Sequence, residues 1–199
     1  MESITPLHVL GISGSLRKAS YNSALLRAAA ELLPPGMVLD TFDLSLLPLF
    51  NADHEKPFPA PVAEFRTRLA EADALLIASP EYNSSVTPAL KNAIDWASRP
   101  AQSPLNRKPV AIMGASTGNF GTVRAQLHLR QILTHVGALT VPKPEVLIAR
   151  ADKAFDADGN LLDEAARGFL RDLLAALADW TWQVSQPVQV LTAEGPRRG

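Results

Sequence analysis

The sequence predicts an α/β fold in which helices cover both faces of a parallel sheet. Two observations lead to this prediction: short, continuously apolar segments recur along the chain, and segments with helical spacing of apolar residues separate them. Parallel strands need crossover connections, which helices supply. The chain has 199 residues, of which 47% are apolar, enough for one sizeable core but too few for two typical domains.

Five segments are predicted to be strands. They lack alternation of polar and apolar residues, as expected for strands that are covered on both faces. Four are clear, at residues 7–12, 74–78, 110–115 and 146–149, and a weaker one lies at 38–42. Five strands that alternate with helices suit a flavodoxin-like three-layer sandwich with the strand order 2-1-3-4-5.

The remaining segments are assigned to helices, one long loop and a tail. Apolar residues recur at helical spacing in residues 23–33, 62–72, 89–97, 123–136 and 163 to about 184. The stretch 44–61 is rich in proline and polar residues, which predicts a long loop. We expect residues 1–191 to form a single domain and residues 192–199 to form a flexible carboxyl-terminal tail.

Composition excludes several classes of function. Nineteen basic and 20 acidic residues give a formal charge of −1, so a basic face for nucleic acid is not expected. The absence of cysteine excludes disulfides, thiolate nucleophiles and iron–sulfur clusters, so redox chemistry would need an organic cofactor or a non-thiolate metal. The turn Asp156–Asn160 lacks the spacing of a calcium loop, and we expect no metal site. Without a signal-peptide pattern or a spanning apolar stretch, we expect a cytoplasmic protein with no membrane partner.

The first predicted strand runs into a loop that is rich in phosphate-binding groups. A helix amino terminus with free N–H groups, hydroxyls, an amide and a guanidinium suits a phosphate dianion. The spacing matches neither a dinucleotide motif nor a Walker A motif, which favours a single terminal phosphate. Alternatively, Ser20 and Asn22 only cap the helix and Arg17 is a solvated charge. The candidate residues are Gly14, Ser15, Leu16, Arg17, Ser20, Tyr21 and Asn22.

Two further strands end in loops with ligand-binding character. A proline-stiffened loop can present a ring and backbone amides to a flat heterocycle, and a glycine-rich loop lets the backbone approach a ligand closely. In the order 2-1-3-4-5 these loops share one sheet edge with the first loop, which predicts a cofactor site there. Alternatively, the prolines only mark a strand exit and a helix entry. The candidates are Pro80, Glu81, Tyr82, Asn83 and Ser84 in one loop and Ser116, Thr117, Gly118 and Asn119 in the other.

These motifs together resemble the NADPH-dependent FMN reductase family, particularly its chromate and quinone reductase branch. The resemblance extends from Val9 to about Val146, and it rests on the three loops, on residues 90–96 and on Gly114-Ala115. It implies FMN as the cofactor and NADPH or NADH as the electron donor. It also implies that Ser15, Arg17, Ser20 and Asn22 surround the phosphate, that Pro80 to Asn83 lie along the isoalloxazine, and that Ser116 to Asn119 complete the pocket.

The resemblance further implies an enzyme that passes electrons to a small-molecule acceptor. Quinones, azo dyes, nitro compounds and metal oxyanions such as chromate are the acceptors of this family, whose members are commonly dimers or tetramers. Hydride transfer is intrinsic to the flavin, so we expect no catalytic side chain, a ping-pong cycle, and charge stabilisation by N–H groups near Asn83 and Gly118. Departures from a frequent family pattern at Ser84, at residues 87–89 and at Thr117 bear on the shape of the acceptor site.

Two other functions are weighed against this one. A flavodoxin-type electron carrier would share the fold and the cofactor, but such carriers usually present an acidic face, which a charge of −1 does not indicate. A hydrolase could use Ser13 in a turn that resembles a nucleophile elbow, but Ser15 replaces the final glycine and no histidine is placed as its base. We expect Trp96, Trp180 and Trp182 to anchor the core or a subunit interface.

Overall fold

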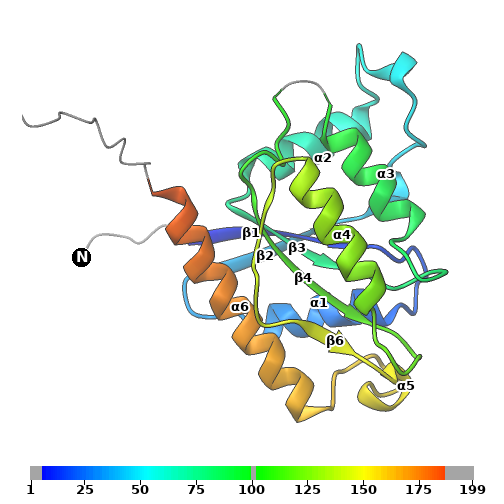
Figure 1. The fold of residues 1–199 in the computed structure, drawn as a ribbon, viewed down its shortest axis with the longest axis vertical. Helices are drawn as coiled ribbons and strands as arrows, with labels where there is room; N and C mark the ends of the chain where they lie inside the picture. Colours follow the sequence, from blue (N-terminus) through cyan, green and yellow to red (C-terminus); the bar gives the residue numbers. More distant parts are fainter. Residues whose placement is uncertain (1–5, 100–101, 187–199) are drawn as a thin grey trace, which may run out of the picture.

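A parallel sheet in the order β2-β1-β3-β4-β5 forms the middle layer of the protein, with a sixth strand, β6, also paired to β4 (Figure 1). The computed structural model describes residues 6–99 and 102–186. The predicted fold class and strand order are confirmed. The predicted tail at 192–199 lies outside the described residues.

The strands occur where the apolar segments predicted them, with one addition. They are β1 (Leu7–Ser13), β2 (Met37–Phe42), β3 (Ala74–Ala78), β4 (Pro109–Ala115), β5 (Leu139–Thr140) and β6 (Val146–Ile148). The sequence did not predict β5, which pairs with the first half of β4, whereas β6 pairs with its second half. Pro142 and Pro144 lie between the two short strands, and because proline has no N–H to donate, the ladder is interrupted there.

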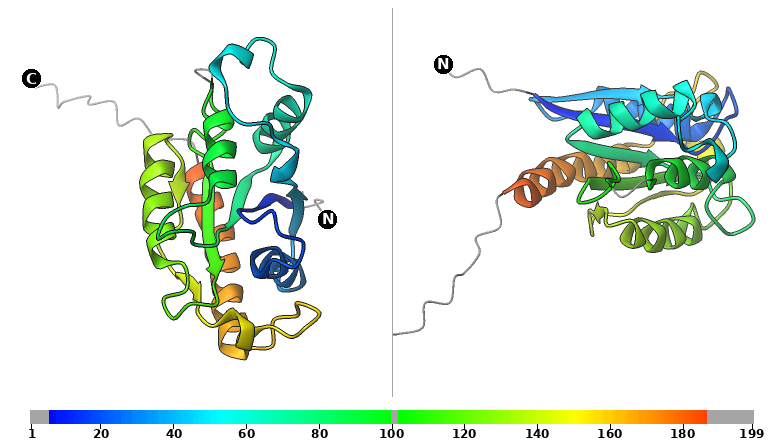
Figure 2. Two further views of the ribbon diagram at one scale, coloured as in Figure 1. Left: turned by 90° about the vertical axis from the view of Figure 1, so that its right-hand side faces the viewer. Right: turned by 90° about the horizontal axis from the view of Figure 1, so that it is seen from above.

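Helices cover both faces of the sheet, as the two views in Figure 2 show. One apolar core joins the sheet to α1 (Tyr21–Glu31), the short α5 (Ala151–Ala154) and α6 (Glu164–Ser185). The other core joins it to α2 (Ala60–Glu71), α3 (Pro88–Ala97) and α4 (Val123–His135). Every residue of β3 and β4 is buried, which explains their continuously apolar sequences. The edge strand β2 is partly exposed, so its apolar pattern in the sequence is weaker.

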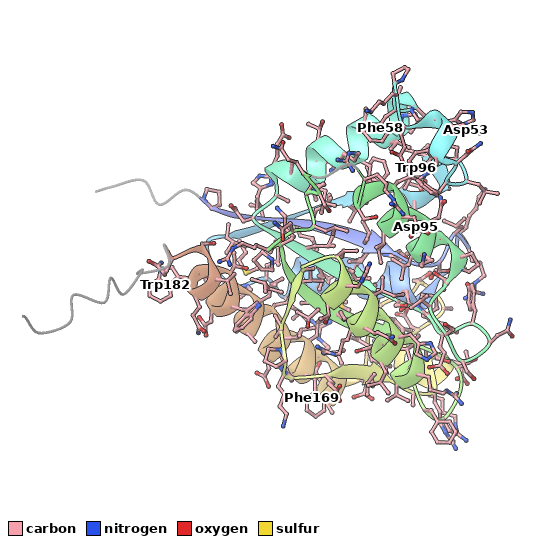
Figure 3. All side chains as sticks on the ribbon, turned by 45° about the horizontal axis from the view of Figure 1, so that its top comes forward. Asp53, Phe58, Asp95, Trp96, Phe169 and Trp182 are labelled. Carbon is pink, nitrogen blue, oxygen red and sulfur yellow. The ribbon has the colours of Figure 1, made fainter. Side chains whose placement is uncertain are left out.

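The long loop predicted at 44–61 is held in place by α3. It contains two short 3-10 turns, Leu44–Leu46 and Ala52–His54. The Trp96 indole donates a hydrogen bond to Pro48 O at 2.8 Å, and the Asn92 amide accepts one from Phe50 N at 2.7 Å. Trp96 is fully buried beside Phe58 (Figure 3), so the expectation that it anchors the core is confirmed. Trp182, in contrast, is 67% exposed on α6.

Among the helices of the described ranges, none is both long enough and apolar enough to traverse a bilayer.

Candidate functional site

The loops that follow β1, β3, β4 and β6 meet at one edge of the sheet. The register pairs Ser13 with Ala78, Ala78 with Met113 and Ala115 with Ile148, so the four strands end near the same level. This edge lies on the right in Figure 1 and faces the viewer in the left view of Figure 2. We call the three predicted segments the phosphate loop (residues 14–20), the aromatic loop (79–87) and the glycine loop (116–122). The structure brings them together as predicted.

The phosphate loop carries unused hydrogen-bond donors. Within residues 6–99 and 102–186, the N–H groups of Leu16, Lys18 and Ala19 donate no hydrogen bond. Arg17 is exposed, with its guanidinium carbon 5.8 Å from the Tyr21 ring centroid. Because these N–H groups and the Arg17 guanidinium donate no hydrogen bond within the described residues, they are available to an anion.

Ser20 and Asn22 also have structural roles. The Ser20 hydroxyl caps α1 by accepting hydrogen bonds from Asn22 N and Ser23 N. The buried Asn22 side chain donates to Ala115 O at 2.9 Å and accepts from Ala115 N at 3.0 Å. Ser20 therefore caps α1 as an acceptor, which leaves its hydroxyl proton as a donor, while Asn22 ties α1 to the end of β4.

Two glycines allow these segments to approach one another. A Cβ atom at Gly14 would lie 2.6 Å from Leu90 Cδ1 on α3. A Cβ atom at Gly114 would lie 2.1 Å from Thr122 Oγ1 and 2.4 Å from the carbonyl oxygen of Ser79. All three distances are far inside van der Waals contact, so a larger residue at either position would push these segments apart.

The aromatic loop contains a tight two-residue turn. Tyr82 and Ser85 exchange backbone hydrogen bonds of 3.1 and 3.0 Å, and Asn83 and Ser84 between them have φ angles of 50° and 63°. Positive φ at both central residues is typical of a type I′ turn, and it is strained for a residue other than glycine or asparagine. The Tyr82 hydroxyl lies 3.4 Å from Ser15 Oγ, which connects this loop to the phosphate loop.

Glu81 connects the aromatic loop to α4. Its side chain is 6% exposed. One carboxylate oxygen accepts hydrogen bonds from Arg124 N at 2.9 Å and Ala125 N at 3.1 Å, and the other accepts from Arg124 Nε at 2.6 Å. Burial alone would raise the pKa of Glu81, but the hydrogen bonds from Ala125 and Arg124 outweigh it and hold the pKa below its ordinary value. Glu81 is therefore a charged carboxylate that caps the amino terminus of α4, the helix that follows the glycine loop.

The glycine loop is braced by the turn after β6. Arg150 N donates to Gly118 O at 3.0 Å, and Arg150 Nε donates to Asn119 Oδ1 at 3.1 Å. The Gly118 N–H donates to Ser116 Oγ at 3.1 Å. Sequence reasoning missed Arg150, although it follows the last predicted strand directly and all parallel strands of this sheet end at the same edge.

A cavity of about 540 Å³ adjoins the phosphate loop on the side of β2. Arg17, Lys18 and Arg27 contribute cationic side chains to its wall, and Leu26 and Phe42 contribute apolar surface. Sequence reasoning missed Arg27, which lies on the first helix two turns after Ser20. Among the described residues that line this cavity, Asp43 is the one acidic side chain, so the balance of charge at this end of the site is positive, as an anionic cofactor requires.

The predicted site residues differ in their exposure. On the surface of the edge lie Leu16, Arg17, Tyr82, Asn83, Ser84, Thr117, Gly118 and Asn119. Buried or half-buried are Gly14, Ser15, Ser20, Tyr21, Asn22, Pro80, Glu81 and Ser116. The exposed set can meet a ligand directly, and in the other set Asn22 and Glu81 tie neighbouring elements together.

Comparison with known proteins shows the family of this chain. A family model described as NADPH-dependent FMN reductase matches residues 7–153. The chain belongs to this family. An NAD(P)H-dependent FMN reductase from Pseudomonas aeruginosa is 54% identical over 175 residues, which cover 87% of this chain and 95% of the relative. An NADPH:quinone oxidoreductase from Arabidopsis thaliana is 43% identical over 192 residues, which cover 91% of this chain and 97% of the relative.

A solved structure supports the same assignment to the FMN reductase family. The flavoenzyme FerB, an NAD(P)H:acceptor oxidoreductase from Paracoccus denitrificans, superposes with a TM-score of 0.82 at 36% identity, covering 88% of this chain and 97% of FerB. The predictions of an oxidoreductase, of FMN and of NAD(P)H as electron donor are confirmed at the level of the family. The site fits FMN, because unused N–H donors and Arg17 suit its phosphate. Electron transfer by a non-enzymatic carrier and hydrolysis at Ser13 receive no support from these relatives.

Proposed function

We propose that this FMN reductase uses NAD(P)H to reduce quinones, and that it also accepts azo compounds, nitro compounds and metal oxyanions such as chromate. The observation that carries the proposal is the convergence of the phosphate, aromatic and glycine loops on one edge, with Tyr82 beside Ser15. The relative named an NADPH:quinone oxidoreductase supports quinones as acceptors. Bound FMN would supply the acceptance and donation of hydride.

The phosphate loop would hold the FMN phosphate. Arg17 provides a guanidinium for charge-assisted hydrogen bonds, and the free N–H groups of Leu16 and Lys18 add neutral donors. The Ser15 and Ser20 hydroxyls can each donate their proton to a phosphate oxygen. Asn22 would act by positioning this loop against β4.

The aromatic and glycine loops would hold the isoalloxazine ring. Pro80 to Ser84 would lie along the ring, and Ser116 to Asn119 would close the pocket. In the described ranges the Asn83 N–H donates no hydrogen bond, so it can stabilise negative charge on the pyrimidine side. The Gly118 N–H already donates to Ser116 Oγ. Of the N–H groups near Gly118, those of Thr117 and Asn119 would therefore be the ones that stabilise the negative charge.

The nicotinamide and the acceptor would use the same exposed surface between Tyr82 and the glycine loop. If each must leave before the other binds, the enzyme follows a ping-pong cycle. Initial rates measured over a grid of NADPH and benzoquinone concentrations test this order of binding. Parallel double-reciprocal lines are expected, whereas intersecting lines would contradict it. Replacing benzoquinone with an azo dye, a nitroarene or chromate tests the wider range of acceptors.

We also propose a homodimer or homotetramer, as the family resemblance implies, and a cytoplasmic location, as expected from the sequence without a signal-peptide pattern or a spanning apolar stretch. Trp96 is fully buried within the protomer, so it belongs to the core and cannot anchor a partner. A groove of about 1000 Å³ between α3 and α4, lined by Val86, Ile94 and Ile132 among others, is available for subunit contact. Light scattering after gel filtration tests the oligomeric state, and a monomeric mass would contradict it.

A further inference from the structure

The amino terminus of α4 obtains its cap from another loop. Thr122 occupies the N-cap position, but its hydroxyl accepts from the Gln126 side chain at 3.1 Å and caps no backbone N–H of the helix. Instead, Glu81 accepts the N–H groups of Arg124 and Ala125. The first turn of α4 continues directly from the glycine loop. Because Glu81 binds this turn, the aromatic loop and the start of α4 must move together.

The same carboxylate orients a side chain on the rim of the site. Glu81 Oε1 accepts from Arg124 Nε and pairs with Arg124 Nη2, both at 2.6 Å. The Arg124 guanidinium carbon then lies 5.4 Å from the ring centroid of Phe120, which is 69% exposed on the glycine loop. A cation held at this position attracts the ring face and restricts its rotation. Glu81, Arg124 and Phe120 thus form a chain of contacts from one loop to the other.

We propose that Glu81 is a positioning residue for the flavin ring: through Arg124 and the first turn of α4 it fixes the spacing between the aromatic and glycine loops and the orientation of Phe120. This inference rests on the proposed function, because it takes the space between these two loops as the ring site. Glu81 acts through its hydrogen bonds and its charge is compensated, since Arg124 and the positive end of the α4 dipole lie against the carboxylate. The aromatic and glycine loops therefore keep a fixed spacing for the isoalloxazine. The negative charge of Glu81 is compensated by Arg124.

Three variants and a matched control test the role of Glu81. Glu81→Ala removes both the cap and the ion pair, Glu81→Gln keeps an oxygen that can accept the α4 N–H groups, and Arg124→Gln removes the ion pair alone. The control is Asp95→Asn, which breaks an ion pair of the same 2.6 Å length, Lys91–Asp95, within α3. The readouts are the FMN dissociation constant of the apoprotein, from flavin fluorescence, and the midpoint potential of the FMN-loaded protein.

The expected result is a graded response. Glu81→Ala weakens FMN binding at least tenfold and shifts the midpoint potential, Glu81→Gln recovers most of the affinity, and Asp95→Asn stays within twofold of the wild type. Circular dichroism establishes that each variant is folded at the assay temperature. If Glu81→Ala does not fold, Arg124→Gln decides, because it removes the ion pair and leaves Glu81 in place to cap α4. An FMN affinity more than twofold below that of the wild type then supports the role of Glu81, and wild-type affinity overturns it.

Two outcomes would overturn the role of Glu81. The first is wild-type FMN affinity and midpoint potential in Glu81→Ala and Arg124→Gln. The second is an equal loss in Glu81→Gln and Asp95→Asn, which would indicate a general effect of charge. Failure of the proposed function has a different signature: wild-type protein that binds FMN but oxidises no NAD(P)H in the presence of quinone, in which case the affinity measurements still decide the role of Glu81.

Discussion

Among single residues, Arg17 provides the charge that the phosphate loop offers to a ligand. Arg17→Gln removes a charged donor to the FMN phosphate, and charged hydrogen bonds contribute about 1.5–3 kcal/mol. We therefore predict a rise in the FMN dissociation constant of roughly ten- to a hundredfold, measured by flavin fluorescence titration. Arg171→Gln on α6, whose guanidinium pairs with Glu164, is the control and should leave the constant unchanged. Equal affinities of the two variants would contradict this role of Arg17.

Ser84 is a residue whose conformation favours glycine. Its φ of 63° is left-handed, and such a conformation costs a non-glycine residue about 1–2 kcal/mol. Ser84→Gly removes this strain but adds conformational entropy to the unfolded chain, so we predict a net stabilisation of about 0.5–1 kcal/mol. Thermal unfolding should show a rise in Tm of roughly 1–4 °C. A lower Tm would show that the Ser84 side chain stabilises the folded protein by more than its backbone strain destabilises it.

At the scale of secondary-structure elements, Asn22 joins α1 to β4. Asn22→Ala would leave Ala115 N–H and C=O without partners in a buried position, and each such group costs about 1–3 kcal/mol. We predict a loss of roughly 2–4 kcal/mol in the free energy of unfolding, measured with urea. Asn22→Asp keeps the acceptor for Ala115 N but sets a buried carboxylate oxygen against Ala115 O, so it should lose at least as much. A change below about 0.5 kcal/mol in Asn22→Ala, the range of neutral surface substitutions, would refute this role.

The contact between β4, β3 and the glycine loop depends on Gly114. A Cβ atom there would meet the Ser79 carbonyl oxygen at 2.4 Å, and backbone cannot rotate away. We predict that Gly114→Ala destabilises the protein by about 1–3 kcal/mol and also weakens FMN binding. Gly168→Ala on α6, where a Cβ atom meets nothing within 4 Å, is the matched control and should stabilise the helix by about 0.5–1 kcal/mol. Equal unfolding midpoints for the two variants would contradict the steric argument.

For the whole molecule, the sequence predicted the fold and the convergence of three loops at one edge of the sheet because both follow from local patterns. The fully buried strands β3 and β4 read as continuous apolar segments, and the strand order then placed three loops together. The additional strand β5 was missed, since a strand of two residues gives no sequence pattern. The contact between Glu81 and Arg124 could not be predicted from the sequence, because the two residues are 43 positions apart and only folding brings them together.

The most direct test of the central claim is the absorbance spectrum of the FMN-loaded protein under anaerobic conditions. NADPH is added first and benzoquinone second. An NAD(P)H-dependent quinone reductase predicts that NADPH bleaches the flavin band and that benzoquinone restores it. Bound flavin that NADPH cannot bleach, or a bleached band that benzoquinone does not restore, would contradict the account.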